Sequence, residues 1–501
     1  MELLLTAAWT AFFLFLIQKL RFFESGISRR WIQAVFLLKI ALGIVLWYIY
    51  SYHYKDRENA DIFKYFDDSK PMFDALFTEP LSFFKMVSGI GIDASCDKYF
   101  DQMSNWVRLY NQNLYNDNQT IIRFNAIVRL FSMGYYQVHG VFMCFLSLIG
   151  LVALFKVFEN RFEKKKVALF IGTFLLPSVL FWGSGVLKEG ILLLGLGMLF
   201  YAIDNVIKNK KPLQNVILFS GAFALLLIVK MYVLISLLPG LAAFALVSKS
   251  SWNKPVLAHS LSLLLFFLGL FCARYIAPSI DPLEMLANKQ HNFIMLGEER
   301  MLLYRARASF LVKPAQMGCV IPTTDSNFIH LQTGCRIRLF NARKLTEGRV
   351  YTNPSDTLTY KIAMHNAPPK SFFKLTPLKP TAMSFIGMIP EALSNSLFRP
   401  FPWEKLSIMA ALSLFENLAV LAICLLALTH FKKPAENLNW VCFCFSFTIL
   451  LFILIGWTTP VTGAIVRYKI PALPFLIIGL LFLIDEEKLL IRLPFLKKLI
   501  Q

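Results

Sequence analysis

The chain has 501 residues, of which 56% are hydrophobic, and it carries a formal net charge of +20 at pH 7. Apolar runs of about 18 or more residues recur from end to end, which excludes a soluble globular protein because such a protein has too little interior to bury them. The runs are too long for barrel strands, so we expect an all-α, polytopic membrane protein. No P-loop, GxGxxG or zinc-binding motif is present, which argues against an ATP-driven pump.

Hydropathy predicts about eleven membrane-spanning helices for a bilayer core of roughly 30 Å. The first is not a cleavable signal peptide, because Glu2 stands where a basic segment is usual and no A-x-A site follows. The predicted spans cover residues 2–20, 31–52, 136–158, 167–183, 190–207, 213–230, 232–248, 256–277, 406–430, 439–457 and 468–484.

The short connections between these spans predict which side of the membrane each one faces. The alternate connections 184–189 and 458–466 carry almost no basic residues, whereas the others are basic. This is the positive-inside pattern, and it predicts an outside amino terminus and a cytoplasmic carboxyl terminus in a bacterial inner membrane. The basic excess is therefore interpreted as topology, and no nucleic-acid partner is expected. The basic connections contain Lys19, Arg21, Arg29, Arg30, Arg161, Lys164, Lys165, Lys166, Lys208, Lys210, Lys211, Lys249, Lys254, Lys432 and Lys433.

Two long connections lie outside in this topology. Residues 53–122 hold 11 of the 31 acidic residues, while the second long connection is rich in Arg and Lys. Within the second, Cys319 and Cys335 are on the oxidising side of the membrane and are expected to pair. The predicted regions are 1–52 with the first two spans, 53–135 as an outer acidic loop with an interfacial helix, 136–277 as a six-span core, 278–405 as a second outer loop with re-entrant or interfacial helices, and 406–501 with the last three spans and a cytoplasmic tail.

The interfacial helix is expected at residues 121–133, where Arg123 and Arg129 would form the polar side. The apolar stretch 372–404 is interrupted by prolines, so we expect it to be interfacial or re-entrant rather than spanning.

The first outer loop begins with an acidic, aromatic segment, ADIFKYFDDSKPMFDA, at Ala60–Ala75. Its carboxylates could belong to a solvated amphipathic helix, with Lys64–Asp68 and Lys70–Asp74 as ordinary i,i+4 pairs. Asp61 differs because it follows a span closely and is therefore held near the membrane surface. A carboxylate there could act as a general base for an acceptor hydroxyl or help to hold a divalent metal ion.

Four cations are predicted at one depth, on the same side as this acidic loop. Lys188 and Glu189 open a helix after the turn FWGSGVLKEG, where a helix N-terminus suits a phosphate or sugar, although a plain interfacial hairpin has the same features. Lys230, Arg399 and Arg467 lie at other outer span edges, with Tyr468 beside Arg467. Each alone is typical of a membrane anchor. Together they suit an anionic, lipid-linked substrate, and Arg467 is the predicted phosphate clamp, because a guanidinium binds two oxygens at once.

Two charged residues lie well inside predicted spans, away from the span ends. Lys39 and Glu416 are costly in the membrane unless they are paired or face water, so they are candidates either for function or for a structural ion pair.

This pattern resembles the GT-C superfamily, the polytopic glycosyltransferases that use lipid-phosphate sugars. The stretches PSVLFWGSGVLKEG, FRPFPWE…LFENL and GAIVRYKIPALPF are similar to bacterial members associated with surface polysaccharide assembly. The resemblance implies a catalytic carboxylate early in the first large outer loop, which matches Asp61 best, with Asp67 or Asp68 as neighbours. It also implies a lipid-phosphate donor that enters sideways from the bilayer.

The leading hypothesis is therefore a membrane glycosyltransferase that moves a sugar from a polyprenyl-linked donor to a glycan, lipid or protein acceptor. A polysaccharide polymerase is an alternative, and a lipid-linked glycan transporter or flippase is another. A transporter would need an aqueous path lined by intramembrane polar residues, for which Lys39 and Glu416 are the clear candidates.

Overall fold

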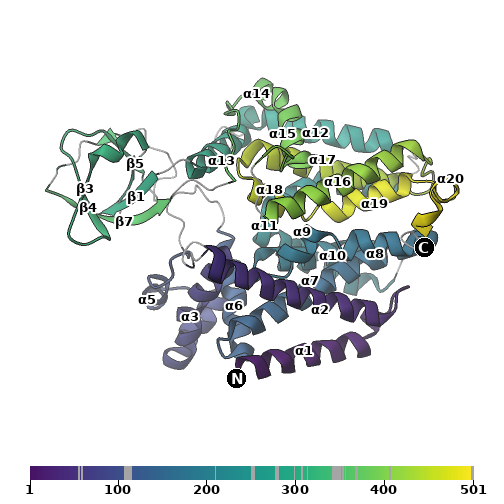
Figure 1. The fold of residues 1–501 in the computed structure, drawn as a ribbon, viewed down its shortest axis with the longest axis horizontal. Helices are drawn as coiled ribbons and strands as arrows, with labels where there is room; N and C mark the ends of the chain where they lie inside the picture. The colour runs from purple at the N-terminus through teal and green to yellow at the C-terminus, as the bar shows by residue number, and fades with distance from the viewer. Residues whose placement is uncertain are drawn as a thin grey trace.

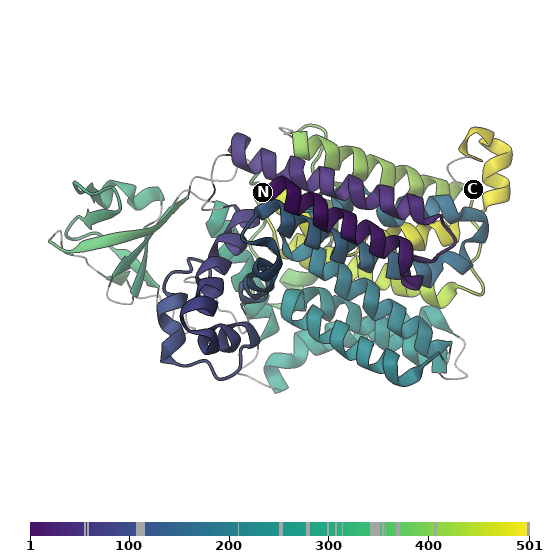
Figure 2. The ribbon, with the colours of Figure 1, turned by 90° about the horizontal axis from the view of Figure 1, so that it is seen from below.

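Helices of the chain form a bundle, and a small β-sheet lies beyond one end of it (Figure 1). In the view turned by 90° the sheet again lies apart from the helices (Figure 2). The computed structural model describes residues 1–54, 57, 60–106, 116–208, 210–249, 254–276, 281–297, 300–305, 308–312, 314–340, 351–352, 355, 357–366, 371–404 and 408–497.

The helices of the first half are α1 (Glu2–Lys19), α2 (Arg29–Tyr48), α3 (Asp61–Thr78), α4 (Pro80–Ser88), α5 (Asp97–Phe100), α6 (Asn118–Ser132), α7 (Tyr136–Phe158), α8 (Lys166–Phe174), α9 (Pro177–Trp182), α10 (Lys188–Ile207), α11 (Pro212–Lys249) and α12 (Pro255–Ile276). Those of the second half are α13 (Pro282–Gly297), α14 (Ala382–Gly387), α15 (Ile389–Phe398), α16 (Ile408–Thr429), α17 (Leu438–Thr458), α18 (Thr462–Tyr468), α19 (Leu473–Leu483) and α20 (Glu486–Arg492).

Within the described residues, eight helices are long and apolar enough to cross a membrane, or nine if the bent pair α18 and α19 forms one crossing. Eleven spans were predicted, so fewer continuous helices of spanning length are present in the described residues than expected. The run predicted at 167–183 is divided into α8 and α9, because Pro177 cannot continue a helix and begins a new one. The runs 213–230 and 232–248 are joined in α11.

Connections predicted to be cytoplasmic meet at one end of the bundle, which we call the basic end. Lys165 Nζ, just before α8, donates to the carbonyl oxygen of Leu481 near the end of α19 (2.9 Å). Arg161 contacts Asp204 near the end of α10 (3.3 Å) and lies 5.2 Å from the ring centre of Trp440 near the start of α17. The amino terminus, α3, α6 and the sheet lie at the opposite end, which we call the sheet end (Figure 1).

Helix α11 reverses direction at Lys230, whose backbone is not helical (φ −152°, ψ 82°). Its first limb starts near the basic end, where Asn215 donates to the loop that follows α10 (2.7 Å). The break lies at the sheet end, where Lys230 contacts Glu189 at the start of α10. The second limb returns to the basic end, where Asn439 of α17 donates to the carbonyl oxygen of Phe244 (3.2 Å). The two limbs therefore run antiparallel, as the two separate spans were predicted to do.

A seven-stranded antiparallel sheet lies within the predicted second outer loop, in the order β3-β4-β7-β1-β2-β5-β6. The all-α prediction is wrong for this segment. Its strands are only two to eight residues long, and half-buried and buried positions alternate over the four residues Phe328–Leu331, which is a much weaker pattern than a span. The strands are β1 (Arg300–Arg305), β2 (Ala308–Val312), β3 (Val320–Pro322), β4 (Phe328–Leu331), β5 (Ile337–Phe340), β6 (Tyr351–Thr352) and β7 (Thr359–Asn366).

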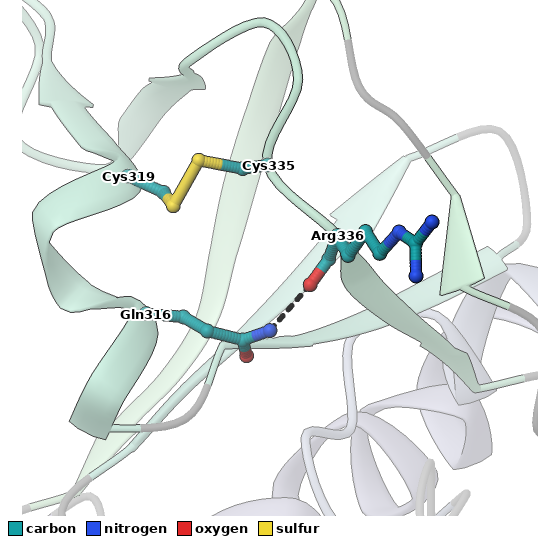
Figure 3. Close-up of a disulfide and its surroundings, with 4 residues drawn as sticks. All are labelled: Gln316, Cys319, Cys335 and Arg336. Atoms are coloured by element: carbon teal, nitrogen blue, oxygen red, sulfur yellow. Dashed lines mark hydrogen bonds between the residues drawn. A yellow bond between two sulfur atoms is a disulfide. The ribbon is translucent and has the colours of Figure 1, made fainter.

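The sheet has its own small core, which includes the buried side chains of Leu303, Val312 and Leu331. Cys319 and Cys335 form a disulfide beside this core, with their Cα atoms 6.2 Å apart (Figure 3). Gln316 donates to the carbonyl oxygen of Arg336 next to the disulfide, which joins the same two segments a second time (Figure 3).

Helix α6 packs against α3 and α4 at the sheet end through one buried and one half-buried arginine. Arg129 of α6 donates to Ser69 Oγ (2.7 Å) and lies 4.3 Å from the ring centre of Phe66. Arg123 donates to the carbonyl oxygen of Met86 (2.8 Å). Both arginines therefore point into the protein, contrary to the expectation that they form the polar side of the helix. The exposed face of α6 is apolar and carries Ile127, Leu130 and Phe131.

Candidate active site

Side chains from four separate elements meet at the sheet end of the bundle. Arg467 of α18 donates through Nη1 to Asp61 Oδ2 (2.6 Å) and through Nε to Glu189 Oε1 (2.7 Å). Lys230 donates to the same oxygen of Glu189 (2.6 Å). We call Asp61, Glu189, Lys230 and Arg467 the ionic cluster. Its formal charges cancel, because two cations face two carboxylates.

Each member of the ionic cluster lies where its element begins, breaks or ends. Asp61 is the first residue of α3, and Glu189 is the second residue of α10. Both carboxylates are thus near helix N-termini, where unpaired N–H groups and the helix dipole favour negative charge. Lys230 is at the reversal of α11, and Arg467 precedes the last residue of α18. Residues 406 positions apart in the chain are brought together in this way.

The members of the ionic cluster differ sharply in exposure. The side chain of Glu189 is fully buried, and those of Lys230 and Arg467 are 5% and 13% exposed. The side chain of Asp61 is 40% exposed. The second oxygen of Glu189, Oε2, has no hydrogen-bond partner among the described residues. Asp61 is therefore the member of the cluster that a substrate could reach from outside.

The electrostatic surroundings of Asp61 keep it ionised. Its partial removal from solvent acts to raise the pKa, but the guanidinium of Arg467 and the ammonium of Lys64 (3.8 Å) outweigh that effect. The result is a pKa below the ordinary value of an aspartate. A carboxylate in this state is a weak base as long as Arg467 stays bound to it.

Lys188 lies beside the cluster but is engaged by other groups. Its Nζ contacts Asp117 Oδ2 (2.8 Å), donates to Asn118 Oδ1 (2.7 Å) and lies 5.1 Å from the ring centre of Tyr65. Asp117 and Asn118 were not among the predicted site residues. They precede and begin α6, and no motif in the sequence distinguishes them from the other polar residues of the predicted first outer loop.

Aromatic rings surround the two cations of the cluster. Lys230 Nζ lies 5.0 Å from the ring centre of Tyr468 and 6.0 Å from that of Tyr232. The guanidinium carbon of Arg467 lies 5.9 Å from the ring centre of Trp182. Rings next to cations are favourable because the negative face of the ring attracts the charge. Tyr468, predicted as a substrate-binding residue, is therefore part of this shell. Tyr232 was missed, although it follows Lys230 by only two positions.

The other carboxylates of the acidic segment are bound elsewhere. Asp67 forms two hydrogen bonds with Arg57 (2.7 and 3.0 Å). Asp68 is buried and accepts the backbone N–H groups of Ser104 (3.1 Å) and Asn105 (2.7 Å), which fixes the loop after α5. Within the described part of the chain, neither contacts the ionic cluster. The structure therefore gives Asp67 and Asp68 structural partners and leaves Asp61 as the catalytic candidate.

Arg399 does not join the three cations that gather near α10. It donates through Nε to Asn395 (2.8 Å), pairs with Glu404, and lies 3.6 Å from the ring centre of Phe373. These contacts occupy it within its own loop. The prediction of four converging cations therefore holds for Lys188, Lys230 and Arg467 in space, while Arg399 belongs to a neighbouring structural arrangement.

The intramembrane charges Lys39 and Glu416 form no ion pair with each other in the described residues. Glu416 accepts the backbone N–H of Ser178 at the start of α9 (2.7 Å), so it satisfies a helix terminus inside the bundle. Lys39 is fully buried near Gly183, just after α9, and its Nζ has no hydrogen-bond partner among the described residues. Another buried lysine, Lys469, was missed by the sequence analysis; it donates to Asn417 Oδ1 (2.5 Å).

A divalent metal ion does not fit the ionic cluster. Metal sites of this kind need several carboxylate or imidazole donors directed at one point. Among the residues that the structure describes, no three His, Cys, Asp or Glu side chains are grouped in that way. The two carboxylates of the cluster are instead bridged by Arg467.

Comparisons of the chain with protein-family models, with curated proteins and with solved structures found no match. The geometry of the site is therefore the feature that bears on function.

Proposed function

We propose that the protein is a multi-pass membrane glycosyltransferase acting at the outer face of a bacterial cytoplasmic membrane. It would move a sugar from a polyprenyl-phosphate donor to a hydroxyl of a glycan, lipid or protein acceptor. The observation that supports this proposal is the contact between Asp61, a reachable carboxylate, and Arg467, a nearly buried guanidinium (2.6 Å). A base and an anion-binding group side by side are what transfer from a phosphate leaving group requires.

The proposed reaction exchanges one bond at the anomeric carbon and transfers one proton. The acceptor oxygen bonds to the anomeric carbon while Asp61 takes the hydroxyl proton. The bond between that carbon and the donor phosphate oxygen breaks, and its electron pair stays on the phosphate. Arg467 and Lys230 stabilise the negative charge that grows there, because fixed cations in a site of low polarity need no reorganisation as the charge develops.

The position of the cluster suits a donor whose lipid tail remains in the bilayer. Glu189, Lys230 and Arg467 lie at breaks or ends of apolar helices that are candidates for membrane spans. A phosphate at that depth would sit at the level of lipid headgroups, and the sugar would face the polar segments of the sheet end. Asp61, the member nearest to solvent, would then face the acceptor.

The decisive experiment compares Asp61→Asn with Asp67→Asn in a strain that reports surface glycan by size on a gel. Both variants remove one negative charge from α3, but Asp67 pairs with Arg57, away from the cluster. We expect Asp61→Asn to reduce transfer by about 100-fold or more, the usual contribution of a general base, and Asp67→Asn to keep it near the wild-type level. Full transfer by Asp61→Asn at normal protein level would remove Asp61 from the mechanism.

A transporter of lipid-linked glycans is the second candidate, and a specific observation favours it. Helices are discontinuous at α8–α9, in α11 and at α18–α19, and buried charged groups lie at or beside these breaks. Discontinuous helices with charged groups also form the substrate sites of many transporters. Purified protein in liposomes decides between the two. Movement of a fluorescent polyprenyl-linked sugar between leaflets without any covalent change would favour the transporter.

A further inference from the structure

Arg467 is held by two carboxylates that differ in every other respect. Glu189 is fully buried and shares its Oε1 with Lys230 as well as Arg467. Asp61 is 40% exposed, and the cations that contact it among the described residues are Arg467 (2.6 Å) and Lys64 (3.8 Å). One side of the guanidinium is therefore fixed inside the protein, and the other side meets a group that is in contact with solvent.

The two ion pairs should consequently differ in how easily they exchange. Separating a buried pair leaves an uncompensated charge inside the protein, which is strongly unfavourable. Separating a partly exposed pair costs little, because water replaces the lost partner. A phosphate offers a guanidinium the same planar pair of oxygens as a carboxylate and carries at least as much charge. It can therefore compete with Asp61 but not with Glu189.

We propose that Asp61 is an exchangeable ligand of Arg467 and that the phosphate of a lipid-linked substrate takes its place, so that phosphate binding and release of Asp61 are one event. Glu189 is the positioning residue that holds Arg467 and Lys230 in place during the exchange. The inference rests on the proposed function, and it adds that the base becomes free only when the donor is bound.

The exchange has a chemical consequence for Asp61. While Arg467 binds it, its pKa is held low and it is a weak base. Once the phosphate neutralises Arg467, the largest favourable charge next to Asp61 is lost, and Lys64 is the cation that remains closest. The carboxylate is then a stronger base and stands next to the bound donor, which limits wasteful reaction when no donor is present.

A binding experiment tests the exchange without requiring any transfer. Farnesyl phosphate is titrated into purified protein in detergent micelles, with farnesol and inorganic phosphate as separate arms. We expect Asp61→Asn to bind farnesyl phosphate about tenfold more tightly than wild type, because the competing charged hydrogen bond is removed. The control Asp67→Asn, with the same change of net charge on the same helix, should bind as wild type does. Weak binding of inorganic phosphate and farnesol would identify a lipid-linked phosphate as the ligand.

A second measurement uses the wild-type protein and so does not depend on the folding of a variant. Labelling of Asp61 by dicyclohexylcarbodiimide, which reacts with protonated carboxyls, is followed by peptide mass spectrometry with and without farnesyl phosphate. Release from Arg467 predicts that the ligand increases the labelling. Unchanged or weaker binding by Asp61→Asn, or protection of Asp61 by the ligand, would overturn the exchange. Tighter binding by Asp61→Asn, together with absent glycosyl transfer by the wild-type protein, would leave the exchange standing and reject the proposed function.

Discussion

Three aspartates of one helix show how partners decide the role of a residue. Asp61, Asp67 and Asp68 have the same chemistry, yet one binds a buried guanidinium, one binds an exposed arginine and one accepts two backbone N–H groups. Burial acts to raise the pKa of Asp68, whereas the cations around Asp61 bring its pKa below the ordinary value. The candidate base is thus selected by its neighbours.

A second polar arrangement shows why hydrogen-bond geometry alone is not sufficient to assign a catalytic role. His139 contacts Ser132 Oγ through Nε2 (2.7 Å) and Asn125 Oδ1 through Nδ1 (2.8 Å), which has the form of a nucleophile, a base and an orienting group. All three side chains are fully buried. No substrate can reach them, so we interpret this set as a polar link that joins α6 to α7.

The ion pair of Asp61 predicts a specific dependence of stability on pH. The pKa of Asp61 is lower in the folded protein than in the unfolded chain. Its contribution to the free energy of unfolding is therefore complete at a pH above the ordinary aspartate pKa, and it is lost as the pH falls through the lower pKa of the folded state. We expect the wild type to melt at a higher temperature than Asp61→Asn from pH 8 to about pH 5. The difference should shrink below about pH 4. Thermal unfolding in detergent measures it, and a difference that grows on acidification would contradict the assignment.

At the scale of elements, the site depends on helices that stop inside the bundle. A straight helix satisfies its own backbone and presents only side chains, whereas a broken one exposes N–H and C=O groups that need partners. Glu416 supplies such a partner at the start of α9, and the reversal of α11 turns Lys230 toward Glu189. The same interruptions that reduce the number of whole spans therefore assemble the charged residues.

Close packing of α7 against α10 keeps Glu189 in place. A Cβ added at Gly150 would overlap the backbone carbonyl of Leu193, whereas one added at Gly140 on the same helix would meet nothing within 4 Å. We expect Gly150→Ala to destabilise the protein by roughly 2 kcal/mol or more, because two backbones would be pushed apart. Gly140→Ala should leave the melting temperature unchanged or slightly higher, since alanine is the better helix former. Equal melting temperatures of the two variants in detergent would show that the backbones of α7 and α10 are not closely packed at Gly150.

At the scale of the whole molecule, the basic connections lie at one end of the bundle, and the amino terminus and the sheet lie at the other. Lys164 pairs with Glu487, and the backbone N–H of Lys432 donates to the carbonyl oxygen of Leu483, so distant basic connections share the basic end. The amino terminus and the sheet are at the other end (Figure 1). This separation is what the positive-inside rule needs if each end faces one compartment.

Reporter fusions test the orientation. We expect green fluorescent protein to fluoresce when fused after Gln501, because it folds in the cytoplasm. Alkaline phosphatase should be active when inserted at Gly334, a turn of the sheet in which a side chain would meet nothing. The opposite pair of results would show the reverse orientation in the membrane and would place the ionic cluster on the cytoplasmic side.

The sequence alone determined the membrane class, the grouping of the basic connections, the pairing of Cys319 with Cys335 as an expectation, and the candidates Asp61, Glu189, Lys230 and Arg467. These follow from hydropathy, charge and position relative to spans, which are local properties. Only the tertiary structure decided that Arg399 lies apart, that Asp67 and Asp68 are bound elsewhere, and that a sheet lies within the predicted second outer loop. It also showed that each of the three converging cations, Lys188, Lys230 and Arg467, contacts a carboxylate. Contacts between residues hundreds of positions apart depend on where helices break and how they pack, and neither is written in a hydropathy pattern.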